Sequence, residues 1–202
     1  MNSKLYWFTG LSGAGKTTIG YLFFNHLKEA GERVVFLDGD SLRAIFSDNQ
    51  KYGLSDRRKL AMRYSNLCKM LVEQDISVVI ATISMFDEVR EWNRKNINNY
   101  NEVYIKVPID ILIERDKKNI YSGALEGKIK NVMGIDIEFE EPKAPDITIM
   151  NATKSYFKYI VMTRCGIPNI QLLGNKEDYI QLLNKIDKLR NFNSLKILIK
   201  FL

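Results

Sequence analysis

The chain has 202 residues, which fits one ordinary domain large enough to bury a substantial core. Apolar residues make up 46% and charged residues 27% of it, a globular composition that argues against intrinsic disorder, and no apolar run approaches the ~18 residues of a membrane span. The formal net charge is +6: residues 1–150 hold 21 basic and 21 acidic side chains, and residues 151–202 hold 9 and 3. The basic excess therefore lies in residues 151–202.

This basic segment is compatible with nucleic-acid binding, but we favour a solvated basic face, because basic patches are common and weak signals. We expect neither a nucleic-acid partner nor a membrane partner. The sequence opens Met-Asn-Ser-Lys directly before a candidate strand, so we expect no cleavable signal peptide. Two separated cysteines and one histidine give no metal-ligand spacing, and they predict a cytoplasmic protein with reduced thiols.

Apolar, β-rich runs alternate with helical patterns along the chain. Helical periodicity marks residues 19–27, with Gly31 as the stop signal, and residues 60–71, with Ser55 as the N-cap. Nearly continuous apolar strands suit a parallel sheet that is covered on both faces. The alternation predicts an α/β protein with a three-layer αβα fold and a central parallel sheet. The predicted strands are 4–9, 34–37, 76–83, 103–107 and 147–150.

The end of the chain differs from the rest in charge, and it carries an amphipathic helical pattern at residues 178–189. We therefore predict two parts. Residues 1–150 form the core, and residues 151–202 form a basic C-terminal helical extension that packs on it. The alternative is that the helix of this extension binds a partner.

The strongest signal is residues 10–17, which match G-x-x-x-x-G-K-[ST] between a predicted strand and a predicted helix. Glycines at 10, 13 and 15 let the backbone N–H groups converge on phosphate oxygens, and the helix that begins at Lys16 adds its positive end. Lys16 then reaches the β- and γ-phosphates, and the Thr17 hydroxyl holds Mg²⁺. The motif predicts a P-loop NTPase fold and an ATP site rather than a fortuitous glycine turn.

A second polar cluster, Asp38, Asp40 and Arg43, follows the next predicted strand. Open α/β sheets bind ligands at this end of their strands. One carboxylate can assist Mg²⁺ and the other can orient and deprotonate an attacking hydroxyl, while Arg43 can clamp an anionic acceptor. The alternative is that the aspartates only cap the next helix. The GTPase signatures D-x-x-G and N-K-x-D are not evident in the sequence, which favours a small-molecule kinase.

The sequence GLSGAGKTT is followed by LDGDSLR, by VYIKVP at 103–108, by Arg-Asp at 115–116 and by Gly-Ile-Asp at 134–136. This ordered set resembles the adenylylsulfate kinase family, which has similar E-V-Y-V-x-x-P, R-D-x-K-G-L-Y and E-I-K-x-F-T-G-I-D motifs. That family uses ATP to phosphorylate the 3′-hydroxyl of adenosine 5′-phosphosulfate (APS). The resemblance covers about residues 4–150.

The resemblance implies a kinase that takes Mg²⁺ with ATP and a nucleotide-type acceptor. It implies that ATP is bound by Gly10, Ser12, Gly13, Ala14, Gly15, Lys16, Thr17, Thr18 and Arg115. The implied metal ligands are Thr17 and Asp38, and the implied catalytic residues are Lys16 and Asp40, although Asp38 stays open as the base. The implied acceptor contacts are Asp38, Asp40, Arg43, Arg58, Ile83, Ser84 and Lys130.

The chain departs from the family pattern around the acceptor. Ala61 stands where the family has an asparagine, Asp87 where it has an arginine, and Val132 where it has the phenylalanine that stacks on the acceptor's adenine. A stacked ring contributes about 1–3 kcal/mol per base in nucleic-acid binding, and a carboxylate repels an anion. These three changes predict an altered acceptor and an unchanged ATP half.

A segment just after Asp87 offers candidates for replacement contacts. Trp92 can stack on a base, and Arg90 and Arg94 lie one helical turn apart on the same face. The alternative is a buried tryptophan with solvated flanking charges.

APS is the default acceptor by family resemblance. The departures favour another nucleotide conjugate, such as cytidine diphosphoramidate, which adenylylsulfate kinase-like enzymes of surface-polysaccharide biosynthesis use. A nucleotide-binding regulatory module is the non-enzymatic alternative, which the retention of Lys16, Thr17, Asp38 and Asp40 disfavours. The oligomeric state stays open, with a homodimer compatible with the sequence.

Overall fold

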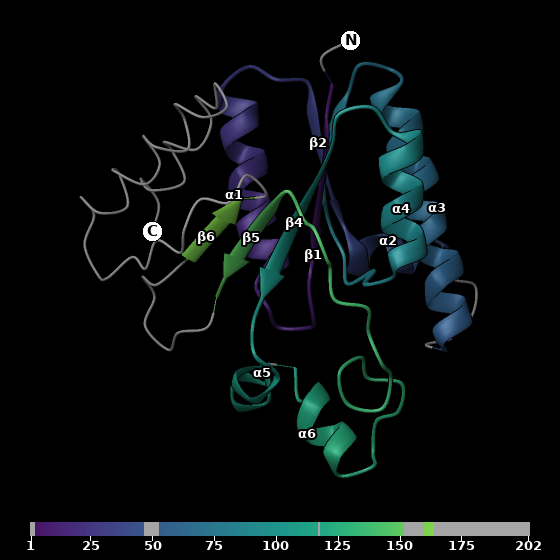
Figure 1. Cartoon of the computed structure of the whole chain (residues 1–202), viewed down its shortest axis with the longest axis vertical. Coiled ribbons are helices and arrows are strands. Elements are labelled where there is room, and N and C mark those ends of the chain that lie inside the picture. The colour runs from purple at the N-terminus through teal and green to yellow at the C-terminus, as the bar shows by residue number, and fades with distance from the viewer. Residues whose placement is uncertain (1–2, 47–52, 117, 152–159, 164–202) are drawn as a thin grey trace, which may run out of the picture.

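The computed structural model describes residues 3–46, 53–116, 118–151 and 160–163. Its centre is a six-stranded sheet flanked by helices (Figure 1). The elements in chain order are β1 (Leu5–Thr9), α1 (Lys16–Glu29), β2 (Val34–Asp38), α2 (Gly39–Phe46), α3 (Leu54–Val72), β3 (Ser77–Ala81), α4 (Asp87–Asn96), β4 (Tyr100–Lys106), α5 (Ile109–Arg115), α6 (Ile120–Leu125), β5 (Ile147–Met150) and β6 (Ile160–Thr163).

The strands lie in the order β2-β3-β1-β4-β5-β6. The first five pair in parallel, and β6 pairs antiparallel with β5. The predicted three-layer αβα fold with a central parallel sheet is confirmed. The register sets Phe8 of β1 opposite Ala81 of β3, and Ala81 opposite Asp38 of β2. The carboxyl ends of these three strands therefore meet at one edge of the sheet, where open α/β sheets bind ligands.

The apolar runs form a core on both faces of the sheet. Every residue of β1 and of β3 is buried, as a parallel strand covered on both sides requires. Helix α1 covers one face, and α3 and α4 cover the other (Figure 1). Gly31, with φ of 83°, follows α1 as the predicted stop signal. Helices α5 and α6 lie beyond the carboxyl ends of the strands (Figure 1).

Two local predictions differ from the structure. Helix α3 begins at Leu54 after an extended Gly53, so Ser55 lies inside the first turn and not at the N-cap. Strand β6 lies within the segment that was predicted to be helical, and the helix predicted at 178–189 lies outside the described residues. Within the described part of the chain, no helix is long and apolar enough to cross a membrane.

His26, the only histidine of the sequence, is buried in α1 with 3% of its surface exposed. Neither ring nitrogen has a hydrogen-bond partner among the described residues, and burial lowers the pKa of this imidazole. The unfolded chain therefore binds a proton more tightly than the folded one, so stability falls as the pH drops below about 6.5. Between about pH 7 and pH 5.5, we expect the melting temperature of the His26→Leu variant to fall less than that of the wild-type chain. Thermal melts followed by circular dichroism measure both changes. Equal losses in the two proteins would contradict this assignment.

Candidate active site

The P-loop, residues 10–17, is the turn between β1 and α1. Gly13 and Gly15 adopt left-handed φ values of 73° and 97°. Gly10 is required by a close approach, because a Cβ there would lie 2.4 Å from the Ile105 carbonyl oxygen of β4. A cavity of about 270 Å³ opens beside this turn. Of the predicted ATP-binding residues, its lining includes Ser12, Gly13, Gly15, Lys16, Thr17, Thr18 and Arg115.

Lys16 is buried at the first position of α1, and its Nζ donates a hydrogen bond to the Leu11 carbonyl oxygen at 2.7 Å. Burial lowers the pKa of Lys16 to about 8, an effect that the carboxylates of Asp40 and Asp38 partly offset. Phosphate oxygens that enter the cavity would favour the charged ammonium form. The fold thus holds the Lys16 amino group against the P-loop backbone, at the wall of a cavity that an anion can enter.

Asp38, the last residue of β2, joins the P-loop to α2. Its Oδ1 accepts the Thr17 hydroxyl at 3.0 Å, and its Oδ2 accepts the backbone N–H groups of Asp40 and Ser41 at 3.1 and 3.2 Å. Asp38 therefore caps α2, and the cap uses one of its two oxygens. The other oxygen and the Thr17 hydroxyl are hard oxygen ligands of the kind Mg²⁺ prefers, so this pair fits a magnesium site.

Asp40, in the first turn of α2, carries an exposed carboxylate that binds Lys118 at 2.8 Å. That hydrogen bond, with the nearby charges of Lys118, Lys16 and Arg43, lowers the pKa of Asp40. The carboxylate is thus ionised at neutral pH and able to accept a proton. Lys118 was not among the predicted site residues, although it occupies the lysine position of the R-D-x-K motif. Lys118 and Asp40 are 78 residues apart in sequence, so no local pattern predicts their contact.

A second cavity of about 580 Å³ adjoins the first and shares Asp40, Arg43 and Lys118 with it. Arg57 and Lys130 also line this second cavity, so cationic groups surround the Asp40 carboxylate. Such a lining favours an anionic ligand. The structure therefore brings the predicted Asp40, Arg43 and Lys130 together beside the cavity at the P-loop.

The loop at residues 127–137 contributes residues 129–133 to the wall of the second cavity. Asp136 holds its turn, because the carboxylate accepts the backbone N–H groups of Asn131 and Val132. Asn131 has a left-handed φ of 64°, and its carbonyl oxygen accepts a hydrogen bond from Arg57 Nη2 at 2.7 Å. Helix α3 is thereby connected directly to the loop that carries Lys130 and Val132.

Ile83 and Ser84, which follow β3 and were predicted to contact the acceptor, line the first cavity, and Ile83 also lines the second. The Ile83 carbonyl oxygen accepts the Thr9 hydroxyl at 2.7 Å, and the hydroxyls of Ser84 and Thr82 lie 2.8 Å apart. These bonds fix the backbone at the carboxyl end of β3. Phe86 is buried and places an aromatic ring on the same wall.

The structure does not bring the predicted Arg58 to this site. Its Nη2 binds Glu140 at 2.9 Å, and its guanidinium lies 5.3 Å from the centre of the Phe86 ring. Arg57 lines both cavities instead. Neighbouring residues of a helix point about 100° apart, and the Arg58 side chain is directed to Glu140 and Phe86. Arg57 precedes the buried Leu60 and Tyr64 by three and seven residues, and this periodicity was the available signal.

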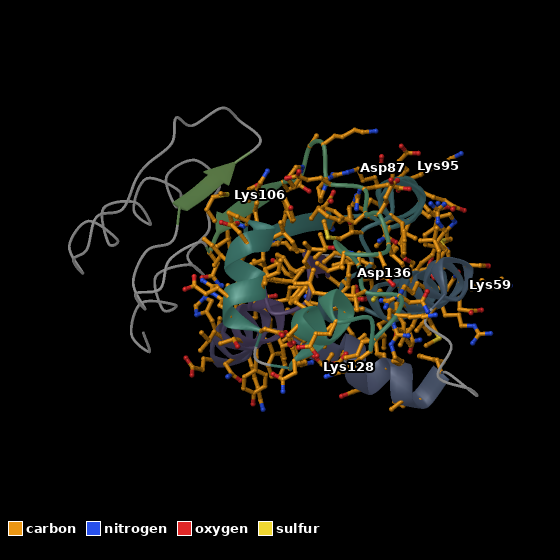
Figure 2. All side chains as sticks on the ribbon, turned by 90° about the horizontal axis from the view of Figure 1, so that it is seen from below. Lys59, Asp87, Lys95, Lys106, Lys128 and Asp136 are labelled. Atoms are coloured by element: carbon orange, nitrogen blue, oxygen red, sulfur yellow. The ribbon has the colours of Figure 1, made fainter. Side chains whose placement is uncertain are left out.

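The three departures from the family pattern have different surroundings. Ala61 lines the first cavity and Val132 lines the second. The Asp87 carboxylate binds Arg90 and, at 2.8 Å, Lys143, and both groups lower its pKa. Figure 2 shows Asp87 well apart from Asp136 of the loop at residues 127–137. Repulsion of the acceptor by Asp87, which the sequence suggested, is therefore not supported, because cations neutralise this carboxylate.

The candidate replacement contacts on α4 have other partners in the structure. Arg90 is buried and binds the Glu140 carbonyl oxygen at 2.7 Å and Glu102 at 3.4 Å. Arg94 binds Glu102 at 2.6 Å and Asp146 at 3.2 Å. Trp92 packs, partly buried, against the core. The arginines thus connect α4 to β4 and to residues 140–146 and serve the fold.

A P-loop at the head of α1, a carboxylate pair after β2 and an adjoining cation-lined cavity define a P-loop kinase. The model of the adenylylsulphate kinase family matches residues 2–150, and the chain belongs to this family. Its members are phosphotransferases that act on hydroxyl groups and use ATP with Mg²⁺. A second family model, for a domain of unknown function, matches residues 140–202.

Similar relatives carry two different names. The chain is 41% identical over 154 residues to a cytidine diphosphoramidate kinase of Campylobacter jejuni, covering 76% of this chain and 89% of the relative. It is 38% identical over 149 residues to an adenylyl-sulfate kinase of Bacillus velezensis, covering 73% and 76%. Among solved structures, it is similar to an APS kinase of Mycobacterium tuberculosis in complex with AMPPNP and APS, with a TM-score of 0.69, 32% identity and coverage of 74% and 88%.

Proposed function

We propose that this kinase transfers the γ-phosphoryl group of ATP to a ribose hydroxyl of a cytidine diphosphate conjugate, with cytidine diphosphoramidate as the first candidate acceptor. The observation that carries this proposal is Val132, which lines the second cavity where the family pattern has an adenine-stacking phenylalanine. The identity of 41% with the Campylobacter jejuni kinase supports it. APS is the second candidate, which the identity of 38% with adenylyl-sulfate kinases favours.

The ATP half of the reaction is assigned to the P-loop. Backbone N–H groups and Lys16 bind the phosphates and stabilise the charge that develops on the transferring group. Thr17 and Asp38 would hold Mg²⁺, which supplies further neutralisation of phosphate charge. Arg115 lines the same cavity from the end of α5. These residues act by position and charge and form no covalent intermediate.

The acceptor half is assigned to Asp40 and the cations around it. In the transfer step the acceptor hydroxyl oxygen bonds to the γ-phosphorus, the bond from that phosphorus to the bridging oxygen breaks, and ADP leaves. The hydroxyl proton goes to the Asp40 carboxylate. Arg43, Arg57 and Lys130 offset the negative charge of a diphosphate conjugate. The cavity lining thus favours an anionic nucleotide. It does not depend on a ring that stacks on adenine.

The Val132→Phe variant tests which nucleobase the acceptor carries. We expect it to raise kcat/KM for APS by roughly 5- to 150-fold, because a restored stack contributes about 1–3 kcal/mol. The Val132→Leu variant, which adds bulk without a ring, is the matched control, and melting temperatures show that both variants fold. If the two variants use APS equally well, a missing stack does not explain the acceptor preference.

A further inference from the structure

Asn151, the residue that follows β5, contacts three separate parts of the kinase core. Its backbone N–H donates to the Lys106 carbonyl oxygen at 3.0 Å, at the end of β4. Its side-chain Nδ2 donates to the Ala14 carbonyl oxygen of the P-loop at 2.9 Å. Its own carbonyl oxygen accepts a hydrogen bond from Arg115 Nη2 at 2.9 Å. One residue therefore connects the sheet, the P-loop and the end of α5.

The contact with the P-loop is close. A Cβ on Gly15 would lie 2.9 Å from Asn151 Nδ2, so the amide group packs directly on the backbone of the Ala14–Gly15 peptide. Gly15 is the residue just before α1, with a left-handed φ of 97°. Asn151 also lies immediately beyond residues 2–150, which the family model matches.

The direction of this hydrogen bond matters for phosphate binding. In a trans peptide the carbonyl oxygen and the following N–H point to opposite sides of the bond. Asn151 draws the Ala14 oxygen toward itself, and this turns the Gly15 N–H away from Asn151. Gly15 lines the nucleotide cavity, and N–H groups at this point of a P-loop bind phosphate oxygens.

We propose that Asn151 is a positioning residue for ATP: by holding the Ala14 carbonyl oxygen, its amide group fixes the Gly15 N–H in the phosphate-binding direction. The Asn151 carbonyl oxygen also binds Arg115, so the same residue positions a second side chain of the ATP cavity. The proposal concerns the nucleotide half of the kinase and holds for either acceptor. Its failure would thus leave the acceptor assignment untouched.

The Asn151→Asp variant tests this role, because it replaces the Nδ2 donor by an oxygen of nearly the same shape and keeps both backbone contacts. We expect the Kd for Mg²⁺–ATP, measured by isothermal titration calorimetry on the full chain, to rise by roughly tenfold or more. The Asn151→Ala variant removes the donor without adding charge, and its Kd should rise by about 3- to 10-fold. The matched control is Asn101→Asp in β4, whose Nδ2 donates to the Asn99 carbonyl oxygen, and its Kd should not change.

Melting temperatures of the same variants separate positioning from a structural role. A positioning role predicts weaker ATP binding in variants whose melting temperature stays close to that of the wild-type protein. If Asn151→Asp does not fold, Asn151→Ala decides the question. An unchanged Kd in a folded variant, with or without a lower melting temperature, would overturn the proposal.

Discussion

Lys16→Ala is expected to lower kcat by on the order of 100-fold or more while the protein stays folded. Under the proposed function, the variant removes the ammonium that would bind the transferring phosphoryl group. Folding should survive, because burial lowers the pKa of Lys16 and the charged side chain is therefore disfavoured inside the fold. ADP release measured against time gives kcat, and a thermal melt reports the fold.

The matched control for this variant is Lys95→Ala, since Lys95 is an exposed residue of α4 (Figure 2). It removes the same charge from the chain without touching either cavity, so its kcat should equal that of the wild-type protein. A Lys16→Ala protein with unchanged kcat would contradict the assignment of the phosphate site.

Asp40→Asn is expected to lower kcat by roughly 10²- to 10⁴-fold and to change the Kd for ATP by less than about threefold. An amide in this position still accepts the hydrogen bond of Lys118, but it cannot take the proton of the acceptor hydroxyl. Titration calorimetry with ATP and steady-state turnover measure the two effects separately.

A large loss of ATP affinity in the Asp40→Asn protein would contradict the role of Asp40 as the base. Asp40 would then belong to the metal site, and Asp38 would become the better candidate for the base. Glu91→Gln, on the exposed side of α4, is the control for loss of one carboxylate and should leave both measurements unchanged.

The elements that sequence reasoning found are those with strong local signals. Each of the five parallel strands is an apolar run, and the P-loop combines three glycines, a lysine and a threonine at fixed spacing. Strand β6 (IVMT) is an apolar, β-branched run of the same length as β5 (ITIM), so the sequence did carry a strand signal there, and the helical prediction for residues 151–202 overlooked it.

The site residues that sequence reasoning missed depend on contacts between distant segments. Lys118 reaches Asp40 from the segment between α5 and α6, and Lys143 neutralises Asp87 from the segment before β5. No periodicity within either segment encodes such a pair. The choice of Arg58 over Arg57 has another cause, since it followed the family spacing and not the face of α3 that carries Leu60 and Tyr64.

The ratio of kcat/KM for cytidine diphosphoramidate to that for APS, measured as acceptor-dependent ADP release at fixed Mg²⁺–ATP, tests the central claim most directly. Loss of a stacked ring at Val132 and of the family asparagine at Ala61 predicts a ratio of at least about 10 in favour of the cytidine conjugate. A preference for APS, with kcat/KM of about 10⁴ M⁻¹s⁻¹ or above, would contradict the proposed acceptor.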